Sequence, residues 1–147
     1  MATSNQSFRI SPRELELVRN HAQRDYPCEA CGFLIGESTG GNTRVTSIVP
    51  VPNTAVPETR GRAYAISPQA WMSVEKQVDS LHHVIVGIYH SHPDHNAVIS
   101  RTDAEALWPE LVYLIIPAGS MRHQPPVAWR LDADTGLIRS CPLEVAP

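Results

Sequence analysis

The sequence predicts an α/β fold in which helices pack on the faces of a β-sheet, in a single domain of residues 1–147. The first observation is that short apolar runs typical of strands alternate with amphipathic segments typical of helices. The second is composition: of the 147 residues, 42% are hydrophobic and 18% are charged, which suffices for one core. The third is that no repeat, low-complexity tract or interdomain linker interrupts the alternation.

Two predicted helices in the first half of the chain begin with the same signal, a serine followed by a proline. Ser11 is the predicted N-cap of a helix that ends near Asp25, because Pro27 cannot continue it. Ser67 begins the second helix, whose apolar residues recur at spacings of three and four and predict one face packed on a sheet. That apolar stripe consists of Trp71, Val74, Val78 and Leu81.

The predicted strands are short apolar or β-branched runs bounded by Gly, Pro or polar turn residues. Between the later strands, Ser100 is the predicted N-cap of a third helix that ends near Leu107. The last strand is predicted to be a single edge strand that Pro142 interrupts. In chain order the predicted strands cover residues 32–35, 44–51, 64–66, 84–89, 112–116, 127–131 and 137–145.

The composition excludes several classes of function. Lys and Arg number 12 against 15 Asp and Glu, so the net charge of -3 gives no basic surface for nucleic acid or anionic membrane. No apolar run approaches the roughly 20 residues of a membrane span, and the N-terminal segment lacks the apolar region of a secretory signal. Three cysteines are too few for a disulfide scaffold. We therefore expect a cytoplasmic protein that binds neither nucleic acid nor membrane.

The residues that carry chemistry gather where one predicted strand ends and the next helix begins. His90 and His92 are two residues apart, so both imidazoles point to the same side of the strand. Asp103 lies in the first turn of the following helix, within reach of the same point. Two His and one carboxylate with a fourth position open are typical of catalytic zinc, which activates water and polarises a carbonyl. A hydrolase of this kind also needs a proton carrier, for which Glu29 is the candidate, and an oxyanion donor, for which Ser100 is the candidate.

This pattern resembles the JAMM (MPN-type) metalloprotease family, whose signature is an upstream Glu, then His-x-His-Pro, seven residues and Ser-x-x-Asp. Here the seven residues run from Pro93 to Ile99, so that Ser100 and Asp103 fall in register. The segment from Tyr26 to Gly32 also resembles the Glu-x-Cys-Gly neighbourhood of the family. The resemblance extends from the first helix through Ile116.

The resemblance implies a curved mixed sheet flanked by helices, an architecture shared with cytidine deaminases. It implies one zinc ion per chain, with His90, His92 and Asp103 as the metal ligands. It also implies that Glu29 is the catalytic acid and base and that Ser100 stabilises the oxyanion, although Ser100 has a structural role as N-cap as well.

Within the family, the short chain is most similar to the bacterial members that act on ubiquitin-like sulfur-carrier proteins. The implied function is zinc-dependent hydrolysis of the peptide or isopeptide bond after the Gly-Gly tail of such a protein. Asn96 and Ile99 stand where these relatives often carry proline, a departure that concerns loop shape and substrate choice rather than the ligands. Tail trimming and deconjugation share the same chemistry, so the sequence does not separate them, and it names neither the partner protein nor the oligomeric state.

Three alternatives stay open at this point. The first is a non-catalytic scaffold that keeps the fold and binds partners. The second is a zinc deaminase, since Cys28 and Cys31 fit Pro-Cys-x-x-Cys, but the His-x-Glu that this signature needs upstream is missing after His21. The third is a closed structural zinc site formed by the two cysteines with His90 and His92.

Some neighbours of the motif have no assigned role. Cys31 is expected to pack as a small buried residue, and Cys28 and Cys141 suggest no function. Asp94 and His95 follow the ligands directly, so contact with substrate and simple exposure to solvent are both open.

Overall fold

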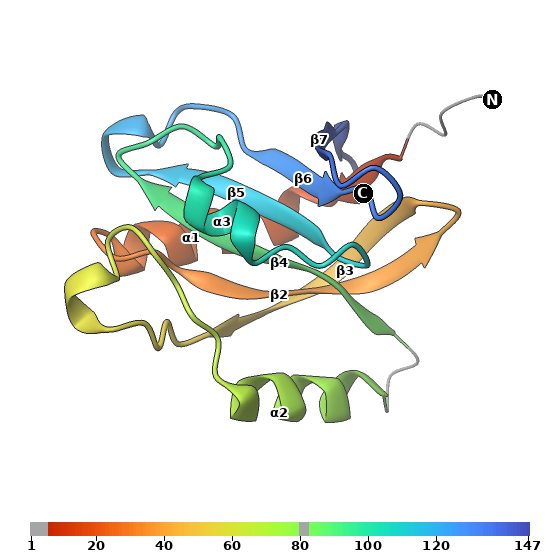
Figure 1. The fold of residues 1–147 in the computed structure, drawn as a ribbon, viewed down its shortest axis with the longest axis horizontal. Helices are drawn as coiled ribbons and strands as arrows, with labels where there is room; N and C mark the ends of the chain where they lie inside the picture. Colours follow the sequence, from red (N-terminus) through yellow and green to blue (C-terminus); the bar gives the residue numbers. More distant parts are fainter. Residues whose placement is uncertain (1–5, 80–82) are drawn as a thin grey trace.

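The computed structural model describes residues 6–79 and 83–147. Within these residues, eight strands form one curved mixed sheet in the order β7-β6-β5-β4-β2-β3-β1-β8 (Figure 1). This arrangement confirms the predicted α/β class. The strands are β1 (Phe8–Ile10), β2 (Cys31–Thr39), β3 (Asn42–Val51), β4 (Val84–Pro93), β5 (Val112–Ala118), β6 (Val127–Leu131), β7 (Ile138–Cys141) and β8 (Leu143–Val145).

The helices begin where the sequence predicts. The first, α1 (Pro12–Asp25), has Ser11 as its N-cap, whose hydroxyl accepts the Glu14 N–H at 3.2 Å. The second is α2 (Pro68–Asp79), and Leu81 of its predicted stripe lies outside the described residues. The third, α3 (Arg101–Glu105), ends earlier than its predicted end at Leu107. Two short 3-10 helices, η1 (Pro57–Thr59) and η2 (Gly119–Met121), complete the helical elements of the described segments.

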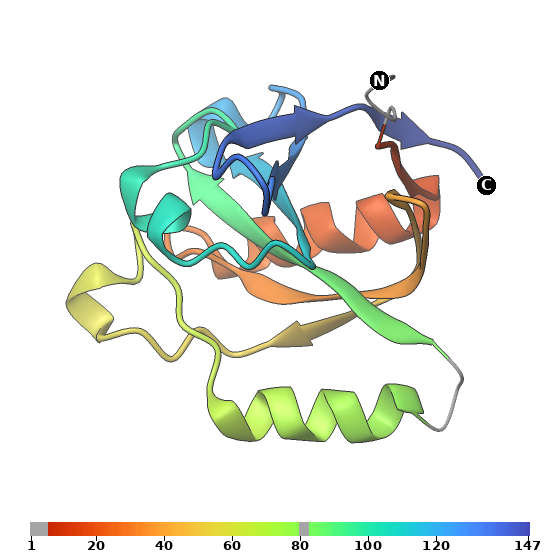
Figure 2. The ribbon, with the colours of Figure 1, turned by 45° about the vertical axis from the view of Figure 1, so that its right-hand side comes forward.

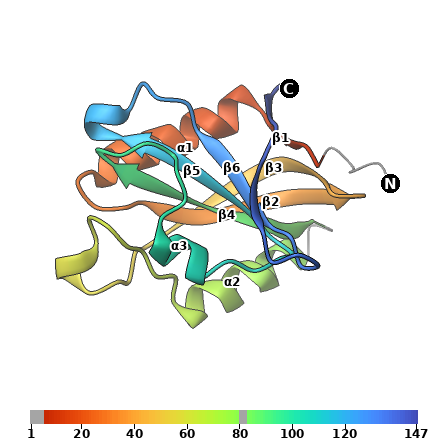
Figure 3. The ribbon, with the colours of Figure 1, turned by 45° about the horizontal axis from the view of Figure 1, so that its top comes forward.

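The two longer helices cover opposite faces of the sheet (Figures 2 and 3). On one face, Leu15 and Val18 of α1 pack in a cluster with Tyr89 of β4. On the other face, Val74 and Val78 of α2 pack in a cluster with Ile88 of β4. Because successive side chains of a strand alternate between faces, His90 and His92 share the α2 face with Ile88.

The segment 64–66 is not a strand, contrary to the sequence prediction. Its backbone bonds go to the preceding loop rather than to the sheet: Ala65 O accepts the Thr54 N–H at 2.9 Å, and the Ala65 N–H donates to Asn53 Oδ1 at 3.1 Å. The side chain of Tyr64 packs against His90 instead of extending a strand face.

The prediction of one C-terminal edge strand is wrong in an informative way. Residues 138–141 form β7 beside β6, whereas residues 143–145 form β8 beside β1, at the other end of the strand order. Only Pro142 separates the two strands, and its carbonyl accepts the Phe8 N–H at 2.9 Å. The sheet therefore curls until its two edges approach each other, which makes it nearly a barrel. The β1 strand itself was not predicted.

No helix in residues 6–79 or 83–147 is long and apolar enough to cross a membrane.

Candidate metal centre

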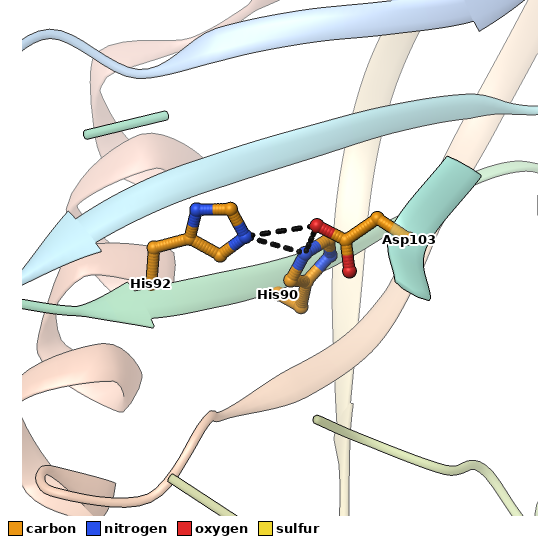
Figure 4. A group of neighbouring side chains, drawn as sticks. All are labelled: His90, His92 and Asp103. Atoms are coloured by element: carbon orange, nitrogen blue, oxygen red, sulfur yellow. Dashed lines mark hydrogen bonds and ion pairs between the residues drawn. The ribbon is translucent and has the colours of Figure 1, made fainter. Parts of the chain in front are cut away.

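Three potential metal ligands meet on the α2 face of the sheet, beside the end of β4 (Figure 4). His90 and His92 project from β4, and Asp103 projects from the first turn of α3. The Asp103 Oδ2 atom lies 2.9 Å from His92 Nε2 and 3.2 Å from His90 Nε2, and the two Nε2 atoms are 3.3 Å apart. All three side chains are buried. The residues that sequence reasoning assigned to metal are thus brought to one point.

The start of α3 holds Asp103 in place through a capping box with Ser100. Ser100 Oγ accepts the Asp103 N–H at 3.0 Å, and the Ser100 N–H donates to Asp103 Oδ2 at 3.1 Å. The carboxylate oxygen that faces the histidines is therefore also fixed by the helix cap. Ser100 has the N-cap role that its position in the sequence allowed.

The two histidines are oriented by different contacts. His92 Nδ1 lies 2.9 Å from the Asn96 carbonyl oxygen. Since a carbonyl oxygen only accepts hydrogen bonds, Nδ1 carries a hydrogen. Nε2 is therefore the nitrogen that faces the other potential ligands, and His90, His92 and Asp103 are called the ligand group below. The ring of His90 stacks on Tyr64 with 4.5 Å between ring centroids. Its buried Nδ1 has no partner among the residues that the structure describes.

The local electrostatics favour a neutral imidazole at His90 and an ionised carboxylate at Asp103. Burial lowers the pKa of His90 below its ordinary value. Burial alone would raise the pKa of Asp103, but hydrogen bonds from His90 and His92 outweigh this effect and hold it well below its usual range. At His92, burial lowers the pKa, while the hydrogen bonds with Asp103 and Asn96 act the other way and leave it raised.

The donor set fits a divalent metal ion such as zinc. In a tetrahedral site with bonds of about 2.0–2.1 Å, two ligand atoms lie about 3.4 Å apart. The three separations between the ligand atoms of His90, His92 and Asp103 range from 2.9 to 3.3 Å, close to that edge length. Three protein ligands leave one tetrahedral position for water or substrate.

Glu29 lies two residues before the start of the neighbouring strand β2, across from His92. The backbone pairing of β2 with β4 continues to Ala30 and Ser91: the Ser91 N–H donates to Ala30 O at 3.0 Å, and the Ala30 N–H donates to Ser91 Oγ at 2.8 Å. The residue before Ala30 therefore faces the residue after Ser91. Cross-strand neighbours share a face, so Glu29 lies on the face that carries the ligand group.

The side chain of Glu29 is buried with one of its two carboxylate oxygens unpartnered. It is 3% exposed, and its Oε1 atom has no hydrogen-bond partner in the described part of the chain. Loss of solvation raises its pKa to about 8, with the nearby charge of His92 lowering the pKa and that of Asp103 raising it. A carboxyl group that exchanges its proton near neutral pH is suited to general acid and base catalysis.

A cavity of about 220 Å³ opens beside the ligand group. The residues that line it include Asp103 and the aromatic side chains of Tyr64, Trp71 and Trp108. The site therefore has a largely apolar approach that reaches one of its ligands.

The two cysteines near the motif are not part of the ligand group. Among the described residues, ligand atoms within 4.8 Å of one another come from His90, His92 and Asp103. Both Cys28 and Cys31 are free, and Cys31 is buried with its sulfur 3.8 Å from the carbonyl oxygens of residues 51 and 52. The closed site of two cysteines and two histidines is not formed.

Two supporting contacts were missed by sequence reasoning. Asn96 orients His92 through its backbone carbonyl, which any residue supplies, so no residue signal could have pointed to it. Tyr64 stacks on His90 from a loop whose course the sequence does not specify. Of the residues left unassigned, His95 is exposed and Asp94 is hydrogen-bonded to Tyr26.

Comparison with known proteins agrees with this geometry. Residues 11–132 match the family described as prokaryotic homologs of the JAB domain. Desampylase from Haloferax volcanii is 40% identical over 125 residues, which cover 82% of this chain and 87% of that protein. The CysO-cysteine peptidase of Mycobacterium tuberculosis is 34% identical over 97 residues, which cover 65% of this chain and 63% of that protein.

Solved structures show the same fold. A protein from Desulfitobacterium hafniense superimposes with a TM-score of 0.82 at 24% identity, over 94% of this chain and 92% of that one. A protein from Salinibacter ruber gives a TM-score of 0.70 at 32% identity, over 95% of this chain and 91% of that one. With a family match that spans most of its length, the chain belongs to the prokaryotic JAB-domain family, of the JAMM (MPN) type that its sequence pattern resembles.

Proposed function

We propose that residues 1–147 form one zinc-dependent peptidase or isopeptidase domain. Its substrate is the bond after the C-terminal Gly-Gly of a ubiquitin-like or sulfur-carrier protein in the cytoplasm. The observation that carries the proposal is the placement of Glu29, a buried carboxyl with an unpartnered oxygen, across from His92 in the ligand group. The relatives named desampylase and CysO-cysteine peptidase support the choice of substrate class.

Each site residue has a distinct task in this reaction. His90, His92 and Asp103 would hold one zinc ion, which would supply a Lewis acid able to acidify water and to polarise a carbonyl. Glu29 accepts a proton from the attacking water and delivers it to the leaving amine. Ser100 accepts the Asp103 N–H with its oxygen, so its own O–H is free to donate to the oxyanion that forms on the carbonyl.

The burial of the ligand group supports a substrate tail without side chains. His90 is 0% exposed, and His92 and Asp103 are 7% and 6% exposed. A pair of glycines can bring its backbone carbonyl close to such atoms, whereas a bulky residue at the same point would meet the surrounding protein. The net charge of -3 gives no support for nucleic acid or an anionic membrane as the partner.

The two alternatives from other classes explain less. A non-catalytic scaffold leaves the buried Glu29 and the complete ligand set without a purpose. A deaminase of the Pro-Cys-x-x-Cys type uses its cysteines as ligands, and here Cys28 and Cys31 lie outside the group.

The test is intact mass spectrometry of a Gly-Gly-tailed sulfur-carrier protein with extra C-terminal residues, together with a carrier linked to a lysine side chain. Each is incubated with zinc-loaded wild-type protein, with Glu29→Ala and with Glu37→Ala, which alters an exposed glutamate on β2. We expect cleavage after Gly-Gly by the wild type and by Glu37→Ala. Glu29→Ala should retain zinc and lose turnover by at least about 10³-fold, because it lacks the proton carrier.

The outcomes separate the parts of the proposal. Cleavage of the extended tail alone identifies a trimming peptidase, and cleavage of the lysine-linked carrier identifies an isopeptidase. Full activity of Glu29→Ala would show that the proton carrier is assigned to the wrong residue. If zinc-loaded wild-type protein left both substrates intact, the proposed substrate class would be wrong.

A further inference from the structure

The segment that carries Glu29 and the loop that follows His92 are tied together by a side-chain contact outside the ligand group. Tyr26 Oη donates to the carboxylate of Asp94, at 3.0 Å from Oδ1 and 2.9 Å from Oδ2. Tyr26 follows α1, and Asp94 follows β4. The contact therefore joins two segments that the sequence keeps 68 residues apart.

The backbone around this contact is shaped to make it. Asp94 adopts φ +62°, in the left-handed region that residues other than glycine rarely occupy. Two further bonds hold it there: its N–H donates to Ala118 O at 2.9 Å, and its Oδ1 accepts the Ser120 N–H at 2.9 Å. The end of β5 and the turn that follows it thus fix the position of Asp94 and its carboxylate.

Gly119 leaves the space that the contact occupies. It has φ +68°, and a Cβ atom at this position would lie 2.2 Å from the Tyr26 ring and 2.4 Å from Asp94 Oδ1. Any larger residue would displace one partner or the other. The hydrogen bond between Tyr26 and Asp94 thus depends on two unusual features, the left-handed backbone of Asp94 and the missing side chain of Gly119. Strained backbone of this kind is typical of functional sites.

The contact closes a ring around the catalytic pair. At one end of the ring, Ala30 and Ser91 pair through two hydrogen bonds. At the other end, Tyr26 and Asp94 pair through the contact described above. Residues 26–30 and 91–94 form the two sides, and Glu29 and His92 lie within them. Hydrogen bonds on both sides of Glu29 and His92 therefore fix the distance between these two residues.

We infer that Tyr26 is a positioning residue, which holds Glu29 at its working distance from the metal centre through its hydrogen bond to Asp94. This inference rests on the proposed function, because it assigns Tyr26 to the step in which Glu29 moves a proton. Tyr26 itself contacts neither the ligands nor the substrate carbonyl in this assignment. A displacement of about 1 Å in a catalytic group can cost about 10²-fold in rate.

The first experiment replaces the hydroxyl alone. Tyr26→Phe keeps the ring against Gly119 and removes the bond to Asp94, so we expect kcat to fall about tenfold. KM should stay within twofold and the zinc content at one per chain, since neither substrate contacts nor ligands change. The matched control is Glu144→Gln, which alters another exposed pair, between Arg9 and Glu144 on β1 and β8, and should leave kcat unchanged.

The second experiment tests whether the bond is the cause. Asp94→Asn keeps an acceptor oxygen and tolerates the left-handed backbone, so it should retain more activity than Asp94→Ala. In the Asp94→Ala background, Tyr26→Phe should have no further effect on kcat, because the bond is already absent. Independent, multiplicative losses in the double variant would overturn the inference, and so would a change confined to KM.

Hydrogen–deuterium exchange provides a readout that does not depend on activity. In Tyr26→Phe we expect faster exchange in peptides that cover residues 26–30 and 93–97, with no change over residues 127–141. Unchanged exchange together with unchanged kcat would refute the positioning role. A wild-type protein that cleaves no carrier substrate would instead refute the proposed function, and the two failures are thus distinguishable.

Discussion

Two buried histidines lie on opposite faces of the same sheet, and their surroundings differ. On the α1 face, His21 Nδ1 lies 2.8 Å from Tyr89 Oη, and its Nε2 lies 3.0 Å from Asp25 Oδ2, so both ring nitrogens have a partner. On the α2 face, His90 Nδ1 has no partner among the described residues, and its Nε2 shares one carboxylate oxygen with His92. Tyr89 and His90 are consecutive residues of β4.

The difference is the one expected between polar groups that only support a fold and polar groups that await a ligand. A buried polar group that only supports a fold is normally hydrogen-bonded, because an unpaired one costs stability. Three buried side-chain atoms in the described residues have no partner, and two of them belong to Glu29 and His90, while the third is Arg130 Nε. The polar groups around His21 are thus paired with one another, whereas two of the three unpaired atoms belong to the ligand residue His90 and to Glu29 beside it.

The largest expected effect comes from comparing Asp103, the carboxylate on the α2 face, with Asp25, the carboxylate on the α1 face. Asp103→Ala removes the oxygen shared by His90 and His92, so we expect loss of bound zinc and a loss of activity of more than about 10³-fold. Asp25→Ala removes the carboxylate that pairs with His21 and should keep one zinc per chain. Metal analysis of both purified variants checks this, and equal zinc in the two would break the comparison.

The second prediction concerns the stability of the metal-free protein as a function of pH. The pKa of Glu29 in the folded state is about 8, above its ordinary value of 4.5, so the folded protein binds an extra proton between these values. The contribution of Glu29 to the free energy of unfolding should therefore fall as pH rises from about 5 to 8, by at most about 5 kcal/mol, since one unit corresponds to about 1.4 kcal/mol.

Glu29→Gln should remove this slope, because an amide does not titrate. Urea unfolding of the metal-free wild type and variant at several pH values measures the effect. The same pH dependence of stability in the two proteins would show that burial does not perturb Glu29.

A third prediction separates the two roles of Ser100. Ser100→Ala removes the N-cap of α3, at about 1 kcal/mol, and the oxyanion donor, at about 10²-fold in kcat. Ser100→Gly retains most of the cap preference but also lacks the hydroxyl, and should lose as much activity as the alanine variant. Ser100→Thr should keep both properties. Near wild-type kcat in Ser100→Gly would assign Ser100 to the cap alone.

The smallest expected effect tests the contacts that His21 makes with Tyr89 and Asp25 on the α1 face. His21→Leu leaves the Tyr89 hydroxyl buried without its partner, so the free energy of unfolding should fall by about 1–3 kcal/mol. Zinc content and kcat should not change. Adding Tyr89→Phe should recover part of the loss, because both polar partners are then gone, and chemical denaturation of the three proteins measures it. A loss of zinc in His21→Leu would show that the two faces are coupled.

The ligand group could be predicted from the sequence because its parts are local. His90 and His92 share a strand end, and Ser100 with Asp103 forms a capping box, so spacing alone indicates where these side chains lie. The placement of Glu29 needed the resemblance to a known family, since only the β2–β4 pairing brings it opposite His92.

The rest of the fold depends on long-range pairing that a local pattern does not contain. The strand Phe8–Ile10 is too short to show a period, and its pairing with residues 143–145 comes from the far end of the chain. Residues 64–66 are β-prone, but their backbone bonds are taken by Asn53 and Thr54. The contact between Tyr26 and Asp94 is equally non-local.

The parallel pairing of β1 with β8 also has a mechanical consequence. Phe8 N–H donates to Pro142 O at 2.9 Å, and Ala146 N–H donates to Ile10 O at 3.0 Å, so hydrogen bonds connect the two strands at both ends. Tension applied across residues 8 and 145 would pull these parallel strands along their axes in opposite directions. The bonds would then be loaded in shear and share the force, instead of opening one after another as in a zipper. The pairing of β1 with β8 would therefore resist a force that pulls residues 8 and 145 apart.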